Sequence, residues 1–322
     1  MKLFSALKGF LKSRLPEPAV HTLRRLKWLC MGEAYSEKSF SRKLERRARQ
    51  LRPVADGPRI DILCCAWNTP EEFLRAMLDS IRCQSYRNWE LLIGNCSDDA
   101  HSAVDGILDE AANRDPRIKP FRLPNRGIAA NTNAVAQHAA GEFIVLMDHD
   151  DLLLPDALEK LAAARQRADA DFVYADEYVL QMEFRRIWRC RKKPFSMAAL
   201  EADNFVNHPV LIRRRLFDAV GGLREGFEGS QDHDLYFRLL EKTDRIAYVD
   251  EPLYVWRINP GSFSERNQER CIASGIRAVT EHLKRMNLAG DVASVGRTTR
   301  YRISNRRPAE PGSAPPSFSD RK

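Results

Sequence analysis

The sequence predicts an α/β fold in which helices cover both faces of a mostly parallel central sheet. From residue 60 onward, short apolar runs alternate with segments of helical periodicity. The runs IDILCCA (60–66), WELLIG (89–94) and FIVLM (143–147) contain few polar residues, which is typical of strands buried on both faces of a parallel sheet. The 322-residue chain is 43% hydrophobic and 30% charged, an ordinary globular composition that excludes a fully disordered protein.

Residues 1–57 precede this alternation and predict a basic, helical extension. The first segment has one apolar helical face, which comprises Leu3, Phe4, Leu7, Leu11 and Leu15. Lysines lie outside that face, so the helix can either rest on an anionic bilayer or pack on the domain, since both arrangements need the same period. Two more basic stretches follow at 21–30 and 39–53, and residues 53–58 predict a linker.

Residues 58–290 predict one α/β domain that ends in a helix. Its first helix should begin with Thr69 as N-cap, Pro70 in the first turn and Glu72 completing a capping box. Further helices are expected at 101–113, 128–139, 155–168, 230–241 and 266–286, and further strands at 117–123, 171–175, 245–249 and 253–256. Residues 291–322 are basic and rich in proline and serine, so we expect this tail to be disordered.

The charge is unevenly distributed along the chain. The net charge of +8 is composed of +10 in residues 1–60, −7 in residues 61–295 and +5 in residues 296–322. A nucleic-acid-binding surface needs clustered cations on the folded face, so the acidic middle argues against a nucleic-acid partner. Basic ends beside an acidic domain instead fit an anionic membrane surface.

The cysteines and the apolar segments favour a cytoplasmic protein. The seven cysteines are an odd number and contain no C-x-x-C motif, so neither a disulfide framework nor a zinc cluster is expected. No apolar stretch approaches the ~20 residues of a membrane-spanning helix, and Lys8, Lys12 and Arg14 interrupt any signal-peptide core. We expect reduced thiols and a cytoplasmic location, peripheral at the inner face of the membrane if the basic ends bind lipid.

The strongest chemical signal is Asp148-His149-Asp150-Asp151, which directly follows the FIVLM strand. Ligands of open parallel sheets bind at the carboxyl ends of the strands. Asp148 and Asp150 are two residues apart, so in an extended chain they face one ligand, and a cation between them would relieve their repulsion. Carboxylate oxygens favour Mg²⁺ or Mn²⁺, which usually bridge to phosphate. The alternative is an acidic cluster that stabilises a helix N-terminus.

Asp232 and two asparagines are further candidates. Asp232 falls in the first turn of an expected helix, whose positive end favours an ionised carboxylate that can act as a general base. The alternative for Asp232 is ordinary capping. Asn68 and Asn95 follow the first two strands and therefore lie at one sheet edge, where they can hold a nucleotide base and ribose. Simple turn chemistry is the alternative for both.

In their order along the chain, these motifs resemble those of the family 2 glycosyltransferases with the GT-A fold, especially bacterial enzymes that build O-antigen and other surface polysaccharides. The resemblance covers residues 60–262 and rests on the blocks CAWNTPEEFLRAMLDSIRCQSYRNWELLIGNCSDD, NRGIAANTNAVAQHAAGEFIVLMDHDD, EGSQDHDLYFRLLE and LYVWR. It implies that Asp148 and Asp150 form the family's D-x-D motif, with Asp150 as the direct metal ligand, and that Asp232 is the catalytic base. It also implies donor-binding roles for Asn68, Asn95, Asn131, Asp176, Trp256 and Arg257.

The reaction that this resemblance implies is inverting transfer of one sugar from a nucleoside diphosphate sugar to a hydroxyl of a glycan or lipid-linked acceptor, with Mg²⁺ or Mn²⁺ at Asp150. Asn95 stands where the family usually has the first Asp of a D-D-x-S loop, which leaves the donor preference open. The Q-x-x-R-W motif of processive synthases is absent, which favours single transfers.

Three other functions remain open from the sequence. A sugar nucleotidyltransferase would share the α/β layout, but it should carry a glycine-rich, arginine-containing loop after the first strand, which CAWNTP lacks. A non-catalytic nucleotide-sugar-binding module would need the donor site and no base. A membrane-surface scaffold would need only the basic ends.

Overall fold

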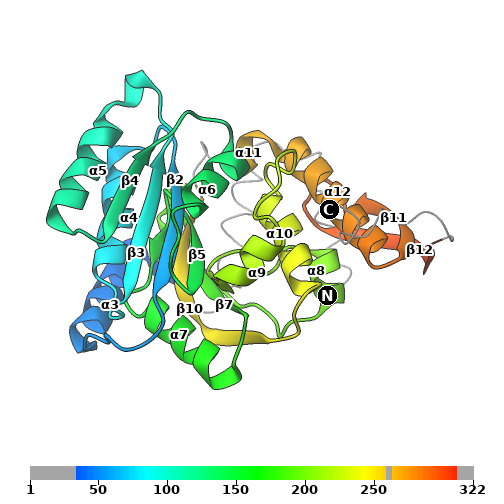
Figure 1. The fold of residues 1–322 in the computed structure, drawn as a ribbon, viewed down its shortest axis with the longest axis horizontal. Coiled ribbons are helices and arrows are strands. Elements are labelled where there is room, and N and C mark those ends of the chain that lie inside the picture. Colours follow the sequence, from blue (N-terminus) through cyan, green and yellow to red (C-terminus); the bar gives the residue numbers. More distant parts are fainter. Residues whose placement is uncertain (1–33, 259–262, 310–322) are drawn as a thin grey trace.

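A ten-stranded sheet forms the centre of the part of the chain that the structure describes, with helices around it (Figure 1). The computed structural model describes residues 34–258 and 263–309, so the expected helix near residues 1–15 and the basic stretch 21–30 lie outside it. The strand order is β1-β8-β7-β9-β5-β2-β3-β4, and β10 pairs with β7 and β6. The strands are β1 (Ala34–Ser36), β2 (Ile60–Ala66), β3 (Trp89–Asn95), β4 (Ile118–Arg122), β5 (Phe143–Asp148), β6 (Leu152–Leu153), β7 (Phe172–Gln181), β8 (Arg186–Cys190), β9 (Val210–Arg213) and β10 (Ile246–Ile258).

Strands β5, β2, β3 and β4 are parallel neighbours. In their register Cys65 lies opposite both Asp148 and Gly94. Strand β9 is antiparallel to β5 and β7, whereas β7 and β10 are parallel to each other. The predicted mostly parallel sheet is therefore confirmed, and the carboxyl ends of β2 to β5 meet at one edge of it.

Side chains of β2 alternate between two hydrophobic cores, because successive residues of a strand point to opposite faces. Ile62 and Cys64 belong to the first core, and Leu63 and Cys65 belong to the second. The helices of the first core are α4 (Glu71–Arg82), α5 (Ala103–Arg114) and α7 (Ala157–Ala168). The helices that contribute to the second core are α6 (Ile128–Ala136), α8 (Met197–Ala202), α9 (Arg214–Ala219), α10 (Gln231–Leu240) and α12 (Gln268–Arg285). Helices thus cover both faces of the sheet, as predicted.

The start of α4 differs from the predicted capping box. Pro70 occupies the N-cap position in an extended conformation, and no side chain caps the helix. Thr69 therefore lies one residue too early to cap the helix. Its hydroxyl instead makes a hydrogen bond of 2.9 Å with Nδ1 of His149. Thr69 ties the loop after β2 to the loop after β5.

Residues 34–50 pack on the edge of the sheet. Strand β1 pairs antiparallel with β8, and the following helix α3 (Glu37–Gln50) is the one expected in the third basic stretch. Phe40 on α3 is buried and packs edge-to-face on Tyr178, with 4.7 Å between the ring centroids. This segment of the predicted N-terminal extension is therefore attached to the α/β domain.

The C-terminal part corrects one expectation. We expected residues 291–322 to be disordered, but strands β11 (Leu288–Ser294) and β12 (Tyr301–Pro308) form an antiparallel hairpin. The hairpin is held because Tyr301 is buried and Val292 and Ile303 pack against the second core. It lies beside α12 and α8, on the side of the molecule away from β3 and β4 (Figure 1). The short helix α11 (Phe263–Arg266) precedes α12.

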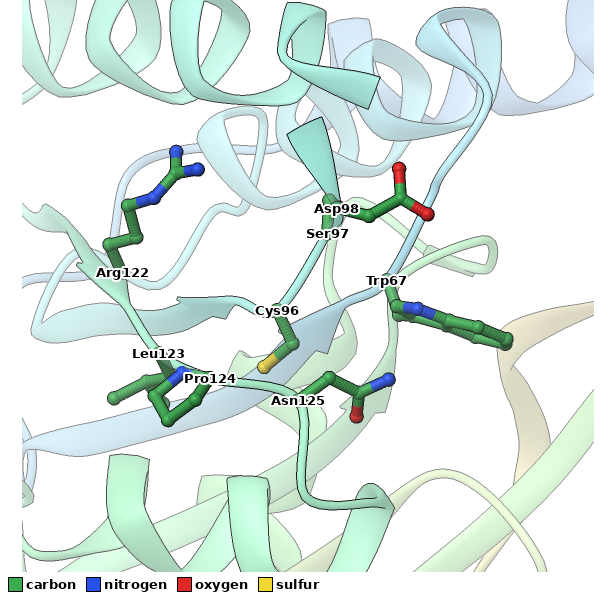
Figure 2. A pocket seen from close by; sticks show the side chains of 8 residues that line it. All are labelled: Trp67, Cys96, Ser97, Asp98, Arg122, Leu123, Pro124 and Asn125. Carbon is green, nitrogen blue, oxygen red and sulfur yellow. The ribbon is translucent and has the colours of Figure 1, made fainter. Parts of the chain in front are cut away.

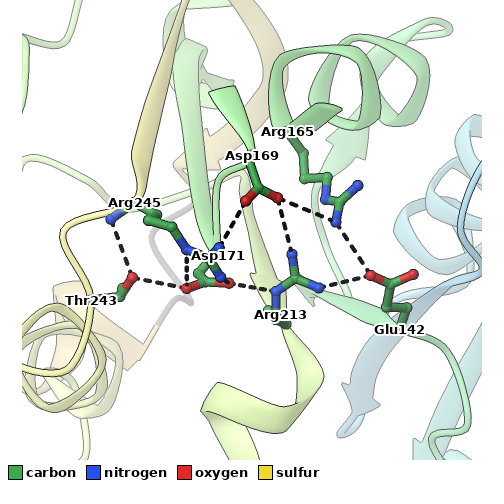
Figure 3. A network of polar contacts seen from close by, with 7 residues as sticks. All are labelled: Glu142, Arg165, Asp169, Asp171, Arg213, Thr243 and Arg245. Carbon is green, nitrogen blue, oxygen red and sulfur yellow. Dashed lines mark hydrogen bonds and ion pairs between the residues drawn. The ribbon is translucent and has the colours of Figure 1, made fainter. Parts of the chain in front are cut away.

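A network of charged side chains closes the amino end of β7, opposite the edge where the strand carboxyl ends meet (Figure 3). Burial alone would raise the pKa of Asp171, but hydrogen bonds from Arg245, Arg213 and Thr243 outweigh burial and lower the pKa to about 2. The network comprises Glu142, Arg165, Asp169, Asp171, Arg213, Thr243 and Arg245. It connects the ends of β5, β7, β9 and β10 and so fixes the positions of these strands relative to one another.

Candidate active site

The Asp148–Asp151 segment leaves the carboxyl end of β5 at the edge where the parallel strands meet. The backbone N–H of Asp148 donates to the Tyr254 hydroxyl at 3.2 Å. Its side chain is 47% exposed, so it faces open space above the sheet. Loss of surrounding water raises the pKa of Asp148, and the negative charges of Asp150 and Asp232 raise it further, against the opposing effect of His208. The carboxylates of Asp150 and Asp232 are therefore close enough to Asp148 for their charges to act on it.

Asp151 and Arg257 fix the position of this segment from its buried side. Asp151 is fully buried, and its Oδ1 accepts a hydrogen bond of 2.8 Å from the backbone N–H of Arg257. The Arg257 guanidinium donates to the carbonyl oxygens of Asp150 and Phe73 and stacks on the Phe73 ring at 4.6 Å. Arg257 is thus directed at the protein backbone, and Trp256 packs against the first core. The Arg257 guanidinium is therefore engaged by backbone carbonyls, whereas the donor-binding role expected of Trp256 stays a prediction.

Asp232 lies in the first turn of α10, as predicted. Its Oδ2 accepts a hydrogen bond of 2.7 Å from Nδ2 of Asn204, and its Oδ1 accepts one of 2.8 Å from the backbone N–H of His233. Burial lowers the pKa of His233 to about 4, and its Nε2 lies 2.8 Å from the carbonyl oxygen of Leu200. His233 is therefore a neutral packing residue, whereas the charge of Asp232 acts on Asp148.

A shallow pocket of about 480 Å³ opens at the carboxyl ends of β2, β3 and β4 (Figure 2). Its lining residues are Trp67, Cys96, Ser97, Asp98, Arg122, Leu123, Pro124 and Asn125. Trp67 is 54% exposed, so one side of the pocket carries an accessible aromatic ring. Such a ring offers a surface on which a planar base can stack.

Asn68 cross-links two loops of this pocket. Its backbone has φ of 51°, in the left-handed region that asparagine tolerates better than most residues. Its Nδ2 donates to Oδ2 of Asp98 at 2.9 Å, and its Oδ1 accepts from the Asp98 backbone N–H at 3.1 Å. Its own backbone N–H donates to the Ser97 hydroxyl. Asn68 is therefore at the predicted place, where it shapes the rim.

Asn95 and Asn131 lie beneath the pocket surface. Asn95 is 3% exposed, and its amide group bonds with Asp105 at 2.6 Å and with the backbone N–H of Ser97 at 3.0 Å. Asn131 is also buried, and its Nδ2 donates to Oδ1 of Asn125, a residue of the pocket wall. Both asparagines use their amide groups inside the protein, so they support the pocket loops instead of presenting an amide to a ligand.

Asp176 is also buried and not exposed at the site. It is fully buried in β7, where its Oδ1 accepts hydrogen bonds from the Tyr248 hydroxyl at 2.7 Å and from the Lys192 backbone N–H at 2.8 Å. Its Oδ2 accepts from Arg189. Because both oxygens are occupied by protein donors, Asp176 acts as a structural link between β7, β8 and β10, and not as a surface ligand.

Sequence reasoning missed Asn204 and His208, which the fold brings to the site. Nε2 of His208 lies 3.6 Å from Oδ2 of Asp148, and its Nδ1 is buried without a hydrogen-bond partner among the described residues. Beneath it, the buried Lys192 donates to the carbonyl oxygen of His208 and lies 3.4 Å from Glu177. The only signal in the sequence was the polar triplet Asn-His-Pro (207–209) directly before the apolar run of β9.

The residues at the β5 edge suit a divalent cation that comes with a phosphorylated ligand. Among the described residues, no three His, Cys, Asp or Glu side chains are placed to enclose a metal ion. Mg²⁺ is commonly bound by one or two carboxylates together with substrate phosphates and water. Asp148 and Asp150 supply such a pair, and the mutual repulsion seen in the pKa of Asp148 is what a cation would relieve.

Comparisons with known proteins place the chain in a family. Residues 61–222, half of the chain, match the family model described as glycosyl transferase family 2. An O-antigen biosynthesis protein, RfbC of Myxococcus xanthus, is 34% identical over 74% of this chain, which covers 19% of that protein. The chain spans 27% or less of the length of the two curated relatives that are 34 and 35% identical to it.

Solved structures support the fold. The structure of S. aureus TarS 1-349 in complex with UDP-GlcNAc aligns with a TM-score of 0.56 at 16% identity, over 70% of this chain and 66% of TarS. The mannosyltransferase PcManGT from Pyrobaculum calidifontis, in complex with GDP-Man and Mn2+, aligns with a TM-score of 0.50 at 16% identity, over 76% of this chain and 71% of that chain. With its parallel sheet, its D-x-D segment and this family match, the chain belongs to glycosyl transferase family 2 and has the GT-A fold.

Proposed function

We propose that this glycosyltransferase transfers a sugar, with inversion and with the aid of a divalent metal, from a nucleoside diphosphate sugar to a hydroxyl of a glycan or lipid-linked acceptor in the synthesis of bacterial surface polysaccharide. The observation that carries the proposal is the electrostatic proximity of Asp232 to Asp148 beside the open Trp67 pocket. The similarity to an O-antigen biosynthesis protein supports the biological setting.

The donor would lie across the carboxyl ends of β2 to β5. The exposed ring of Trp67 can stack on the base, while Asn68, Asn95 and Asn131 hold the surrounding loops in place. The diphosphate would then reach Asp148 and Asp150. The solved neighbours bind donors of this class, UDP-GlcNAc in TarS and GDP-Man in PcManGT.

Asp150 and Asp148 would hold the metal, Mg²⁺ or Mn²⁺, against the diphosphate oxygens. When bound, the ion would stabilise the negative charge that develops on the leaving diphosphate. The Mn2+ in PcManGT supports this choice of ion. Arg257 and Asp151 serve the same purpose indirectly, because they fix the backbone that carries Asp150.

Asp232 would accept the proton of the attacking hydroxyl. Asn204 donates to Oδ2 of Asp232, which orients the carboxylate and leaves lone pairs on both oxygens for the acceptor. Inversion is supported because one direct displacement needs one positioned base for the attacking hydroxyl, while the leaving diphosphate, held by a metal, needs no general acid. His233 keeps the first turn of α10 fixed from inside the core.

The donor site can be tested by thermal shift with UDP-, dTDP- and GDP-sugars, each in Mn²⁺ and in EDTA. A donor at 100 times its Kd should stabilise the protein by about 2.7 kcal/mol. The shift should vanish in EDTA and in Asp150→Asn, and should persist in Asp79→Asn, which changes an exposed carboxylate on α4. Binding without any transfer or donor hydrolysis would favour the non-catalytic binding module, and the absence of any shift would favour the scaffold.

Membrane association is a second part of the proposal. No helix in the described residues is both long and apolar enough to span a bilayer. The exposed face of α3 carries Lys38, Arg42, Arg46 and Arg49, which adds to the basic character of the preceding residues. In a flotation assay, we expect the full chain to rise with vesicles that contain phosphatidylglycerol. With vesicles of pure phosphatidylcholine, it should remain in the bottom fraction.

Glutamate at Lys2 and Lys8 should abolish this flotation, whereas glutamate at the exposed Lys119 and Lys242 of the domain should not. Equal flotation of both double variants would contradict a role for the N-terminal segment.

A further inference from the structure

The β11–β12 hairpin carries a dense positive charge close to the candidate base. Residues 297–307 contain five arginines and no acidic residue, within a chain whose middle is acidic. The hairpin is anchored at Tyr301, whose ring stacks on His233 in the first turn of α10, with 5.9 Å between centroids. The arginine that precedes this anchor, Arg300, therefore lies next to the turn that bears Asp232.

Arg300 is connected to Asp232 through Asp203 and its neighbour Asn204. Nε of Arg300 bonds with Asp203 at 3.1 Å, and the two residues also form a backbone bridge. Asn204, the neighbour of Asp203, donates to Asp232. The side chain of Arg300 is 71% exposed, so most of its guanidinium remains open to a ligand.

Lys193, which lies just after β8, is a second cation that acts on Asp203. It is exposed and directly follows the buried Lys192, and its positive charge acts on the carboxylate of Asp203. The structure shows no ion pair for Lys193 within the described residues. Two cations thus act on one acid, Asp203, whose single negative charge balances only one of them.

This cationic pair lies at the end of α8 and at the hairpin, and not among the carboxyl ends of β2 to β4 that line the Trp67 pocket. An inverting displacement needs the attacking hydroxyl and the leaving diphosphate on opposite sides of the sugar carbon. The Trp67 pocket and the Asp148 segment lie at the ends of β2 to β5, whereas α8, α12 and the hairpin lie beyond α10 (Figure 1). An anionic acceptor would be repelled by Asp148, Asp150 and Asp232 unless cations flank its path.

We propose that Lys193 and Arg300 form an acceptor subsite that binds a phosphate or carboxylate group of the acceptor. This inference rests on the proposed function and names the chemistry of its second substrate. Arg300 would bind the acid group through its planar fork, and Lys193 would add a point charge from the other side. Asn204 and Asp232 would then receive the acceptor hydroxyl.

The test measures probe binding to the full chain by saturation-transfer difference NMR. The donor site is first filled with Mg²⁺, which is diamagnetic, and the nucleoside diphosphate that gives the thermal shift. The probes are methyl β-D-glucoside, methyl β-D-glucuronide and glucose 6-phosphate. We expect at least one acidic probe to bind about tenfold more tightly than the neutral one. Preference for the glucuronide would identify a carboxylate group, and preference for glucose 6-phosphate a phosphate group.

The preference should disappear in Lys193→Gln/Arg300→Gln and persist in Arg307→Gln. Arg307 is an exposed arginine of β12, and at ~3.4 Å per residue it lies on the order of 24 Å from Arg300, which precedes this strand. Equal binding of all three probes to the unchanged protein, an undiminished preference in the double variant, or an equal loss in Arg307→Gln would each overturn the inference. A normal donor shift together with donor hydrolysis in the same samples would show that the proposed function stands even where the acceptor inference fails.

Discussion

The buried pair Lys192–Glu177 beneath His208 allows a quantitative prediction about the stability of the protein. Nζ of Lys192 lies 3.4 Å from Glu177 and donates to the carbonyl oxygens of Val206 and His208. Both side chains are almost fully buried. Lys192→Met keeps the volume but leaves a buried carboxylate and two buried carbonyls without their donor. We expect the free energy of unfolding to fall by about 3–5 kcal/mol, which is typical when one partner of a buried ion pair is removed.

The size of this loss should depend on pH. Burial raises the pKa of Glu177, and in the unchanged protein Lys192 opposes that rise. Without Lys192 the folded-state pKa of Glu177 rises further above its unfolded value of about 4.3, so the folded state holds a proton that the unfolded state releases. Stability of the variant should therefore fall as pH rises above that value, and the deficit should be smaller at pH 5 than at pH 8.

Urea unfolding followed by circular dichroism at these two pH values measures the effect. Lys193→Met is the matched control, because it removes an exposed lysine one residue away and should change stability by about 0.5 kcal/mol or less. The double variant Lys192→Met/Glu177→Gln should lose less than the sum of the single losses, since the unpaired charge is absent. A loss in Lys192→Met no larger than in Lys193→Met, or one that does not vary with pH, would refute the reasoning.

Three further predictions concern the contacts of the site, and a fourth concerns the charged network at the opposite edge of the sheet. Asp232→Asn should abolish sugar transfer while leaving the metal-dependent donor shift unchanged, as thermal shift and product analysis would show. Asn204→Ala should lower kcat about 10–100-fold at an unchanged donor KM, because it frees the base and touches no donor group; a change in KM alone would contradict this role. Arg257→Ala should abolish the donor shift because it removes the hydrogen bond to the backbone of Asp150. An unchanged donor shift in this variant would show that the Asp148–Asp151 loop keeps its position without Arg257. Asp171→Asn should cost about 1–2 kcal/mol at pH 7; since its folded pKa of about 2 lies below the unfolded value, this difference should shrink as acid unfolding is followed below about pH 4.

The frame of this protein could be predicted from the sequence because its strands are buried. Runs such as 60–66 and 143–147 are apolar on both faces, so their place in a covered parallel sheet follows from hydrophobicity alone. The position of Asp148 at a strand end and of Asp232 in a first helical turn follows from the same local patterns. The hairpin escaped prediction, because a few alternating apolar residues among arginines resemble a solvated tail until a partner helix covers them.

The direction of polar side chains at the sheet edge could not be predicted. Asn95 and Asp148 both end a buried parallel strand, yet the first is 3% exposed and the second projects a side chain that is 47% exposed. The difference is set by tertiary partners: Asp105 binds the amide of Asn95, whereas the groups that act on Asp148 are His208, His149, Asp150 and Asp232. Local sequence determines which residues reach the edge, and tertiary partners determine which of them remain available.

The same criterion separates the working groups of this site from their supports. Arg257, Asp176 and Asn131 have their polar atoms occupied by protein partners, and a ligand could contact them only by breaking those bonds. Asp148 and Asp232, in contrast, retain lone pairs for a ligand. Without a ligand, the repulsion between these two carboxylates destabilises the folded protein. A metal with a diphosphate and a donated hydroxyl proton would each remove part of that repulsion. Binding both substrates should thus stabilise the site together, so the donor-dependent rise in unfolding temperature should increase when an acceptor is added.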